Sequence, residues 1–86
     1  MKMASLPMDD KLILMQYAID KYDSENALKE KLKRTLSQKE IERTIDTLIG
    51  MQKVRRIGMD VLQNNVSHSG ELPELPGHLK SILESL

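Results

Sequence analysis

Basic side chains gather in the middle of the chain, where they could neutralise the phosphates of a nucleic acid. Residues 27–58 carry nine basic and four acidic side chains, a net charge of +5, whereas residues 1–26 carry −2 and residues 59–86 carry −3. Lys and Arg bind phosphate oxygens, while shorter polar side chains can reach base edges. The candidate phosphate-binding residues are Lys31, Lys33, Arg34, Lys39, Arg43, Lys53, Arg55 and Arg56, and the candidates for base contacts are Gln38, Thr44 and Thr47.

Acidic side chains in the same stretch leave a second interpretation open. Glu42 and Asp46 lie among the candidate residues, where they would repel phosphates. The net charge of zero and the pI of 6.7 argue against strong non-specific binding to nucleic acid. The basic residues therefore form either a phosphate-binding surface or an ordinary solvated face.

The residue types needed for catalysis or metal binding are scarce. The sequence has no cysteine, and its two histidines, His68 and His78, lack the spacing and partners of a metal site. It has no glycine-rich phosphate loop, and the pair Asp9 and Asp10 is better explained as a helix cap than as paired catalytic acids. We expect a non-enzymatic protein without a cofactor or metal.

A helix that starts at Ser37 is the element best placed to present the basic residues. Ser37 and Glu40 have the spacing of a capping box, in which each residue's side chain accepts a hydrogen bond from the other's backbone amide. Apolar residues then recur at helical spacing, at Ile41, Ile45, Leu48 and Ile49. Beyond the helix, Val54 and Ile57 bracket two arginines and Gly58 allows a turn, which predicts a short hairpin.

Two further helices are predicted before this one. The first runs from about Asp10 to Tyr22, with Asp9 or Asp10 as its cap. The second runs from Glu25 to about Arg34, with Ser24 as its cap. Leu36 lies in the turn before the third helix, where one apolar residue is needed to hold the two helices together.

The first helix is apolar on more than one side, so another element must cover it. Residues 78–86 regain helical spacing but are too short to be stable alone. This last helix either closes the domain's own core or forms an interface with a second copy or a partner protein. The candidate interface residues are Ile13, Leu14, Tyr17, Leu79, Ile82, Leu83 and Leu86.

The organisation predicted along the chain has four parts. Residues 1–8 form an N-terminal arm, residues 9–63 the domain, residues 64–77 a loop rich in turn residues, and residues 78–86 the last helix. The N-terminal stretch lacks the pattern of a secretory signal, and its apolar run is too short to span a bilayer. We expect no membrane association and a cytoplasmic location, or a nuclear one in a eukaryote.

The stretch ALKEKLKRTLSQKEIERTIDTLIGMQKVRRIG resembles the helix-turn-helix and wing of winged-helix domains, and the resemblance covers roughly residues 9–62. It implies a mainly α (α+β) fold: a three-helix core, a small antiparallel β-hairpin wing and an added C-terminal helix. In that family the third helix commonly ends in a glycine with a left-handed backbone, a place that falls here on Gln52. Residues 39–41 and Arg43 also look like the third helix of Z-form-binding winged helices. Glu42 and Asp46 replace the Asn and Tyr of those domains, so that specificity is not implied.

The resemblance implies a third helix in the major groove of DNA, with the wing and second helix on the backbone. We therefore expect a small DNA-binding protein that regulates transcription. The expected contacts to double-stranded DNA are Lys33, Arg34, Gln38, Lys39, Arg43, Thr47, Lys53, Arg55 and Arg56. The alternative is a winged helix that serves as a protein–protein interaction module, as a subunit or adaptor of a complex.

Overall fold

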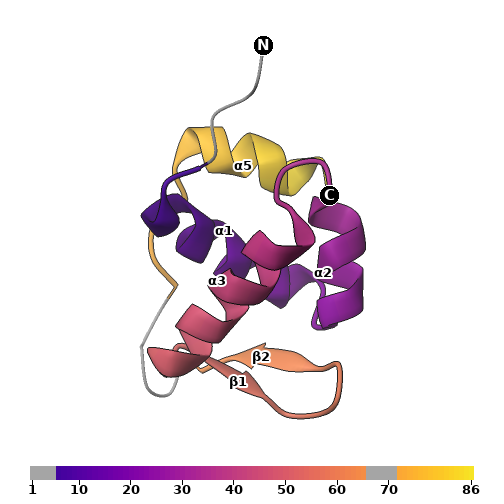
Figure 1. The fold of residues 1–86 in the computed structure, drawn as a ribbon. Coiled ribbons are helices and arrows are strands. Elements are labelled where there is room, and N and C mark those ends of the chain that lie inside the picture. Colours follow the sequence, from indigo (N-terminus) through magenta and orange to yellow (C-terminus); the bar gives the residue numbers. More distant parts are fainter. Residues whose placement is uncertain (1–5, 66–71) are drawn as a thin grey trace.

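The computed structural model describes residues 6–65 and 72–86. Within them lie four helices and one two-stranded antiparallel sheet (Figure 1). The elements are α1 (Met8–Lys21), α2 (Glu25–Leu32), α3 (Gln38–Gly50), β1 (Val54–Arg56), β2 (Leu62–Asn64) and α5 (Gly77–Glu84). The predicted α+β class is confirmed: three helices precede a hairpin and a C-terminal helix, a layout compatible with a winged helix.

Both ends of α3 are fixed by local hydrogen bonds. The predicted capping box is present, since the Ser37 amide donates to Glu40 Oε1 at 3.0 Å and the Glu40 amide donates to Ser37 Oγ at 3.1 Å. At the other end, Gln52 has a left-handed φ of 63°, as the resemblance implied. The Lys53 amide donates to the Leu48 carbonyl at 2.9 Å and the Gln52 amide donates to the Ile49 carbonyl at 3.0 Å, and these two bonds form a Schellman motif.

The first two helices differ from their predicted limits. The first, α1, begins at Met8 after Pro7, which makes no side-chain cap bond, so the prediction of Asp9 or Asp10 as the cap is wrong. These acids lie in the first turn, where their negative charges interact favourably with the helix dipole. The second, α2, ends at Leu32 rather than Arg34, because the chain turns there towards the corner. Its predicted cap, Ser24, is confirmed by a 3.2 Å bond from the Ala27 amide.

One hydrophobic core joins all four helices and the hairpin. Leu36 in the corner is buried, as predicted, and Val54 and Leu62 bring the hairpin into the same core. Because Val54 lies opposite Asn64 and Arg56 opposite Leu62, Arg55 and Gln63 lie on the outer face of the hairpin. The completely buried apolar residues of the helices are Leu14, Met15, Ala18, Leu28, Leu32, Ile41, Ile45, Leu48 and Leu79.

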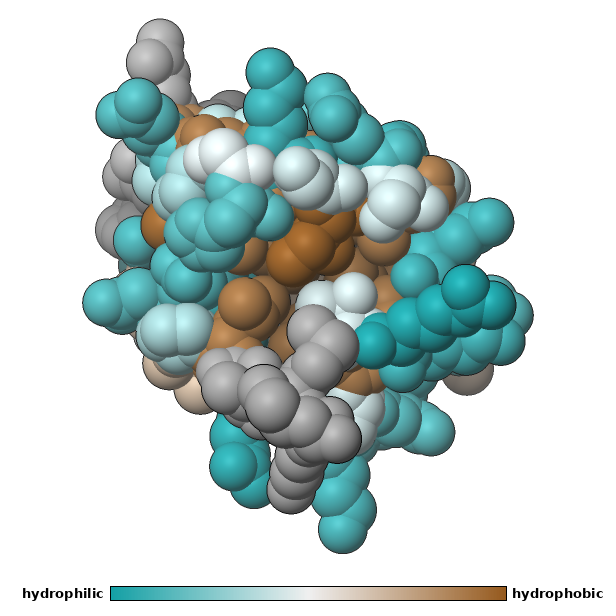
Figure 2. Space-filling view, turned by 90° about the horizontal axis from the view of Figure 1, so that it is seen from above, coloured by the Kyte–Doolittle hydropathy of each residue, from teal (hydrophilic) through white to brown (hydrophobic). Residues whose placement is uncertain are grey.

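The last helix, α5, packs across α1 (Figure 1). It begins at Gly77 and ends at Glu84, so Leu86 lies beyond the helix that was predicted to reach it. Two side-chain contacts hold it to α1: Lys21 Nζ donates to the Leu83 carbonyl at 3.3 Å, and His78 Nε2 lies 2.9 Å from Asp10 Oδ2. Seen from above, the side of the molecule that carries α5 shows hydrophobic residues at its centre, surrounded by hydrophilic ones (Figure 2).

Candidate nucleic-acid interface

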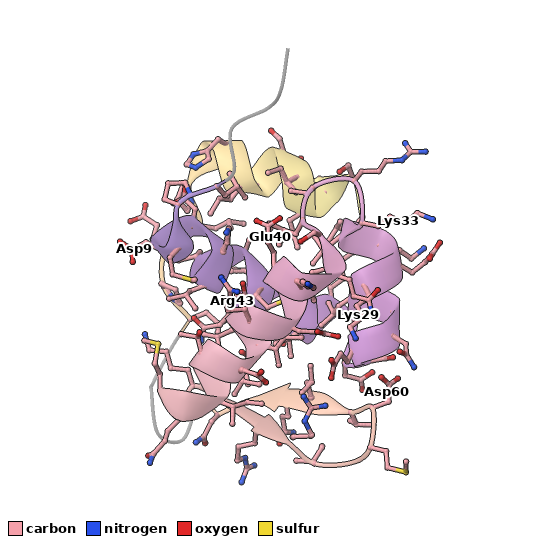
Figure 3. All side chains as sticks on the ribbon, in the orientation of Figure 1. Asp9, Lys29, Lys33, Glu40, Arg43 and Asp60 are labelled. Carbon is pink, nitrogen blue, oxygen red and sulfur yellow. The ribbon has the colours of Figure 1, made fainter. Side chains whose placement is uncertain are left out.

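The outer side of α3 presents a short row of charged residues. Because an α-helix has 3.6 residues per turn, Lys39, Arg43 and Asp46 lie opposite the buried Ile41 and Ile45. Figure 3 places Arg43 on the side of α3 nearest the viewer, with α1 behind the helix. Among the described residues, the side chains of Lys39 and Arg43 form no ion pair, so both cations are available to an anionic partner.

A shallow open hollow lies along this row. It has a volume of about 520 Å³, and five side chains of α3 line it: Lys39, Glu42, Arg43, Asp46 and Thr47. The Thr47 hydroxyl donates to the Arg43 carbonyl at 2.8 Å, which leaves its oxygen able to accept from outside. The hollow is polar and open, which suits contact with a polar macromolecule better than enclosure of an apolar ligand.

One of the two acids expected to repel phosphate is neutralised within the protein. Lys29 of α2 donates to Glu42 Oε2 at 2.8 Å across the α2–α3 interface. Hydrogen bonding to Glu42 raises the pKa of Lys29, and the same bond lowers the pKa of Glu42, so both groups stay charged near neutral pH. Their charges cancel locally, which leaves Asp46 as the uncompensated acid of the row.

The ion pair continues through α2 to the hairpin. Glu25 lies 3.4 Å from Lys29 Nζ and 2.6 Å from Arg56 Nη1, so Glu42, Lys29, Glu25 and Arg56 form one connected chain of charges. Figure 3 shows Lys29 beside α3 on the side of α2. The Arg56 side chain is therefore held in an intramolecular ion pair. Arg55 instead lies on the outer face and donates to Gln63 Oε1 at 3.0 Å.

Asp60, in the turn between β1 and β2, connects the hairpin to the start of α2 through hydrogen bonds. Its carboxylate accepts from the Ser24 hydroxyl and from the Asn26 amide, the latter at 2.9 Å, and its carbonyl accepts from the Glu25 amide at 3.0 Å. The Ser24 and Asn26 bonds lower the pKa of Asp60. A further bond, from the Leu62 amide to the Asp23 carbonyl at 2.8 Å, fixes the hairpin at a second point.

The remaining candidates for DNA contact have different surroundings. Thr44 is completely buried and donates to the Glu40 carbonyl at 2.7 Å, so the prediction that it could reach a base is wrong. Lys33 pairs with Glu30 at 2.8 Å. The Nζ atom of Lys31 lies 5.7 Å from the centre of the Tyr22 ring. Gln38 and Arg34 are exposed near the corner, and Lys53 is half-buried where the hairpin begins.

The candidate interface residues contribute in part to the chain's own core. Leu14 and Leu79 are completely buried, and the Tyr17 hydroxyl donates to the Pro73 carbonyl at 2.5 Å. The second apolar side of α1 is thus covered by α5 and by the segment before it. Ile13, Ile82, Leu83 and Leu86 are half-buried against this core, and a partner surface on them stays a prediction.

The described residues also bear on metals and membranes. No group of three or more metal-binding side chains comes together in residues 6–65 and 72–86. Of the two histidines, His78 contacts Asp10 and His68 lies outside the described residues. Across these same ranges, no helix has the length and apolar character needed to cross a bilayer.

Sequence reasoning missed three residues that shape this surface: Glu25, Lys29 and Asp60. Glu25 and Lys29 have the i, i+4 spacing of a helical ion pair, a signal that was readable in the sequence. No local pattern marks Asp60, because its partners lie at least 34 residues away.

Comparison of the chain with models of protein families, with curated proteins and with solved structures found no significant match. Its function is therefore inferred from the geometry of α3 and the hairpin.

Proposed function

We propose that this protein is a winged-helix protein that binds double-stranded DNA and regulates transcription. In this proposal α3 enters the major groove, whose width admits an α-helix. The hairpin, acting as the wing, contacts the phosphate backbone. The observation that carries the proposal is the exposed row on α3, in which Lys39 and Arg43 form no ion pair with any described residue while Glu42 is neutralised by Lys29.

The attachment of the hairpin supports a preformed binding surface. Asp60 and the Arg56–Glu25 pair hold it against the start of α2, so little ordering is needed when DNA arrives. The pairing of Arg56 also changes which side chains meet phosphate. Lys53 and Arg55 supply the phosphate contacts of the wing, and Lys39 supplies one from α3, where Arg43 faces the groove. Thr47 lines the hollow together with Lys39 and Arg43, whereas Lys33, Arg34 and Gln38 lie near the corner before α3.

A fluorescence-anisotropy titration with a mixed-sequence duplex at two salt concentrations tests the proposal. We expect a dissociation constant of roughly 10⁻⁴–10⁻⁶ M that weakens steeply as salt rises, because phosphate contacts release counterions. Lys39→Ala should weaken binding and reduce the salt slope by about one unit. Lys80→Ala on α5 removes the same charge from another element and serves as the control. Absence of binding at low salt, or equal effects of the two variants, would contradict the proposal.

The tip of the hairpin favours a second candidate function, a protein–protein interaction module. Met59 is fully exposed, Ile57 is 55% exposed and Val61 is 37% exposed, so three large apolar side chains lie in water together. Such a group can anchor a protein partner. Sedimentation of the wild type and of Ile57→Ser with Met59→Ser tests self-association through this tip. A monomer in both cases would exclude a homodimer formed there.

A further inference from the structure

Asp46 contributes no visible stabilisation to the fold. It is exposed on α3, and it forms no ion pair or hydrogen bond that joins it to the rest of the described chain. Its charge lies in the C-terminal half of α3, where the helix dipole does not favour an anion. Aspartate is also a weak helix former. Nothing in the described fold engages this carboxylate, so it is free to contact a partner.

The surroundings of Asp46 define what it could bind. It lines the hollow on α3 together with Arg43, three residues earlier in the helix. Two cations, Lys39 and Arg43, line the same hollow, but a phosphate against Asp46 would be repelled. If α3 lies in the major groove, the groups there that can donate to a carboxylate are the amino groups of cytosine and adenine, and adenine places its N7 acceptor beside that amino group, where it would repel a carboxylate.

We infer that Arg43 and Asp46 act together to select adjacent G·C pairs in the major groove, an inference that rests on the proposed function. Arg43 donates to the O6 and N7 acceptors of a guanine, and Asp46 accepts from the N4 amino group of a cytosine. Residues three apart in a helix are neighbours on one face, with Cβ atoms roughly 5–6 Å apart, a spacing comparable to the roughly 3.4 Å between successive base pairs. The two side chains can therefore reach neighbouring pairs.

Glu42, the other acid of the hollow, is less suited to this role. Its Oε2 atom is bound to Lys29 at 2.8 Å, and releasing it would break the chain of charges to the hairpin. Asp46 has a shorter side chain with fewer rotamers, so a directed contact costs it less conformational entropy. The structure thus separates the two acids: Glu42 connects α3 to α2, and Asp46 stays available.

Selection from a pool of duplexes with a randomised central segment, followed by sequencing of the bound fraction, tests the inference. The wild-type protein should enrich sequences with two adjacent G·C pairs. Replacing the pair read by Asp46 with A·T should weaken binding about tenfold. Asp46→Ala should lose the preference at that pair alone. Asp46→Asn should shift it to adenine, because an amide can both accept from N6 and donate to N7.

Glu84→Gln on α5 is the matched control, since it removes one negative charge from another exposed position. It should enrich the same sequences as the wild type. A uniform gain in affinity for every duplex with Asp46→Ala would overturn the inference, because Asp46 would then only repel phosphate. Binding by the wild type without any preference would overturn it too, while leaving the proposed DNA binding intact. No binding of any duplex by the wild type would overturn both.

Discussion

Replacing Lys29 by methionine tests whether this residue keeps Glu42 from repelling DNA. Lys29 belongs to α2 and donates to Glu42 Oε2 at 2.8 Å, with its side chain 22% exposed. Methionine keeps most of the apolar stem but removes the charge. Glu42 would then carry an unpaired negative charge on the α3 surface. We expect Lys29→Met to weaken DNA binding although Lys29 belongs to α2 and is not one of the proposed DNA contacts.

The size of the effect follows from Coulomb's law. A carboxylate roughly 7 Å from one phosphate in a water-like medium weakens binding about two- to threefold at low salt. Two phosphates at similar distances bring the loss to about fivefold, and salt near 0.1 M screens part of it. A second change, Glu42→Gln, removes the repelling charge. In the Lys29→Met background it should therefore restore binding to about the wild-type level.

Anisotropy titrations of the four proteins of this double-mutant cycle measure the coupling directly. Glu84→Gln in the Lys29→Met background is the control, because it restores the same net charge at another place. It should not restore binding. If Glu42→Gln fails to rescue Lys29→Met, Lys29 acts through its own attraction to DNA and the reasoning is refuted. Equal rescue by Glu84→Gln would also refute it, since only net charge would then matter.

Three further predictions concern the stability of the fold, each measured by urea unfolding. The Ser37 amide and the Lys11 ammonium lower the pKa of Glu40 to about 2. The stability that Glu40 adds is therefore present above its ordinary pKa of 4.5 and is lost as the pH falls towards 2. Glu40→Gln should make the free energy of unfolding less dependent on pH in this window, and an unchanged dependence would contradict the assignment. Gln52→Gly should raise the free energy of unfolding by about 1 kcal/mol, because glycine accepts the left-handed backbone without steric cost, and a destabilised variant would argue against that conformation. Leu79→Ala should lower it by about 2–5 kcal/mol, because Leu79 is completely buried, whereas a loss well under 1 kcal/mol would mean that α5 is not part of this core.

Short-range patterns in the sequence were sufficient for most of the elements. The capping box at Ser37, the cap at Ser24 and the apolar spacing of α3 involve partners within a few residues, so they could be read directly. The left-handed backbone at Gln52 was implied by the family resemblance and is present. The errors lie at helix ends, where a residue such as Asp9 can serve either as a cap or as a first-turn residue with similar energy.

The sequence by itself determined the order of the elements, the basic centre of the chain and the exposed character of Lys39 and Arg43. Only the tertiary structure decided which charges remain available. Glu42 is neutralised by Lys29, Arg56 is engaged by Glu25, and α5 covers α1. The physical reason is distance along the chain: helical spacing and caps depend on neighbours, whereas ion pairs and burial depend on residues that the fold brings together from 13 to 68 positions apart.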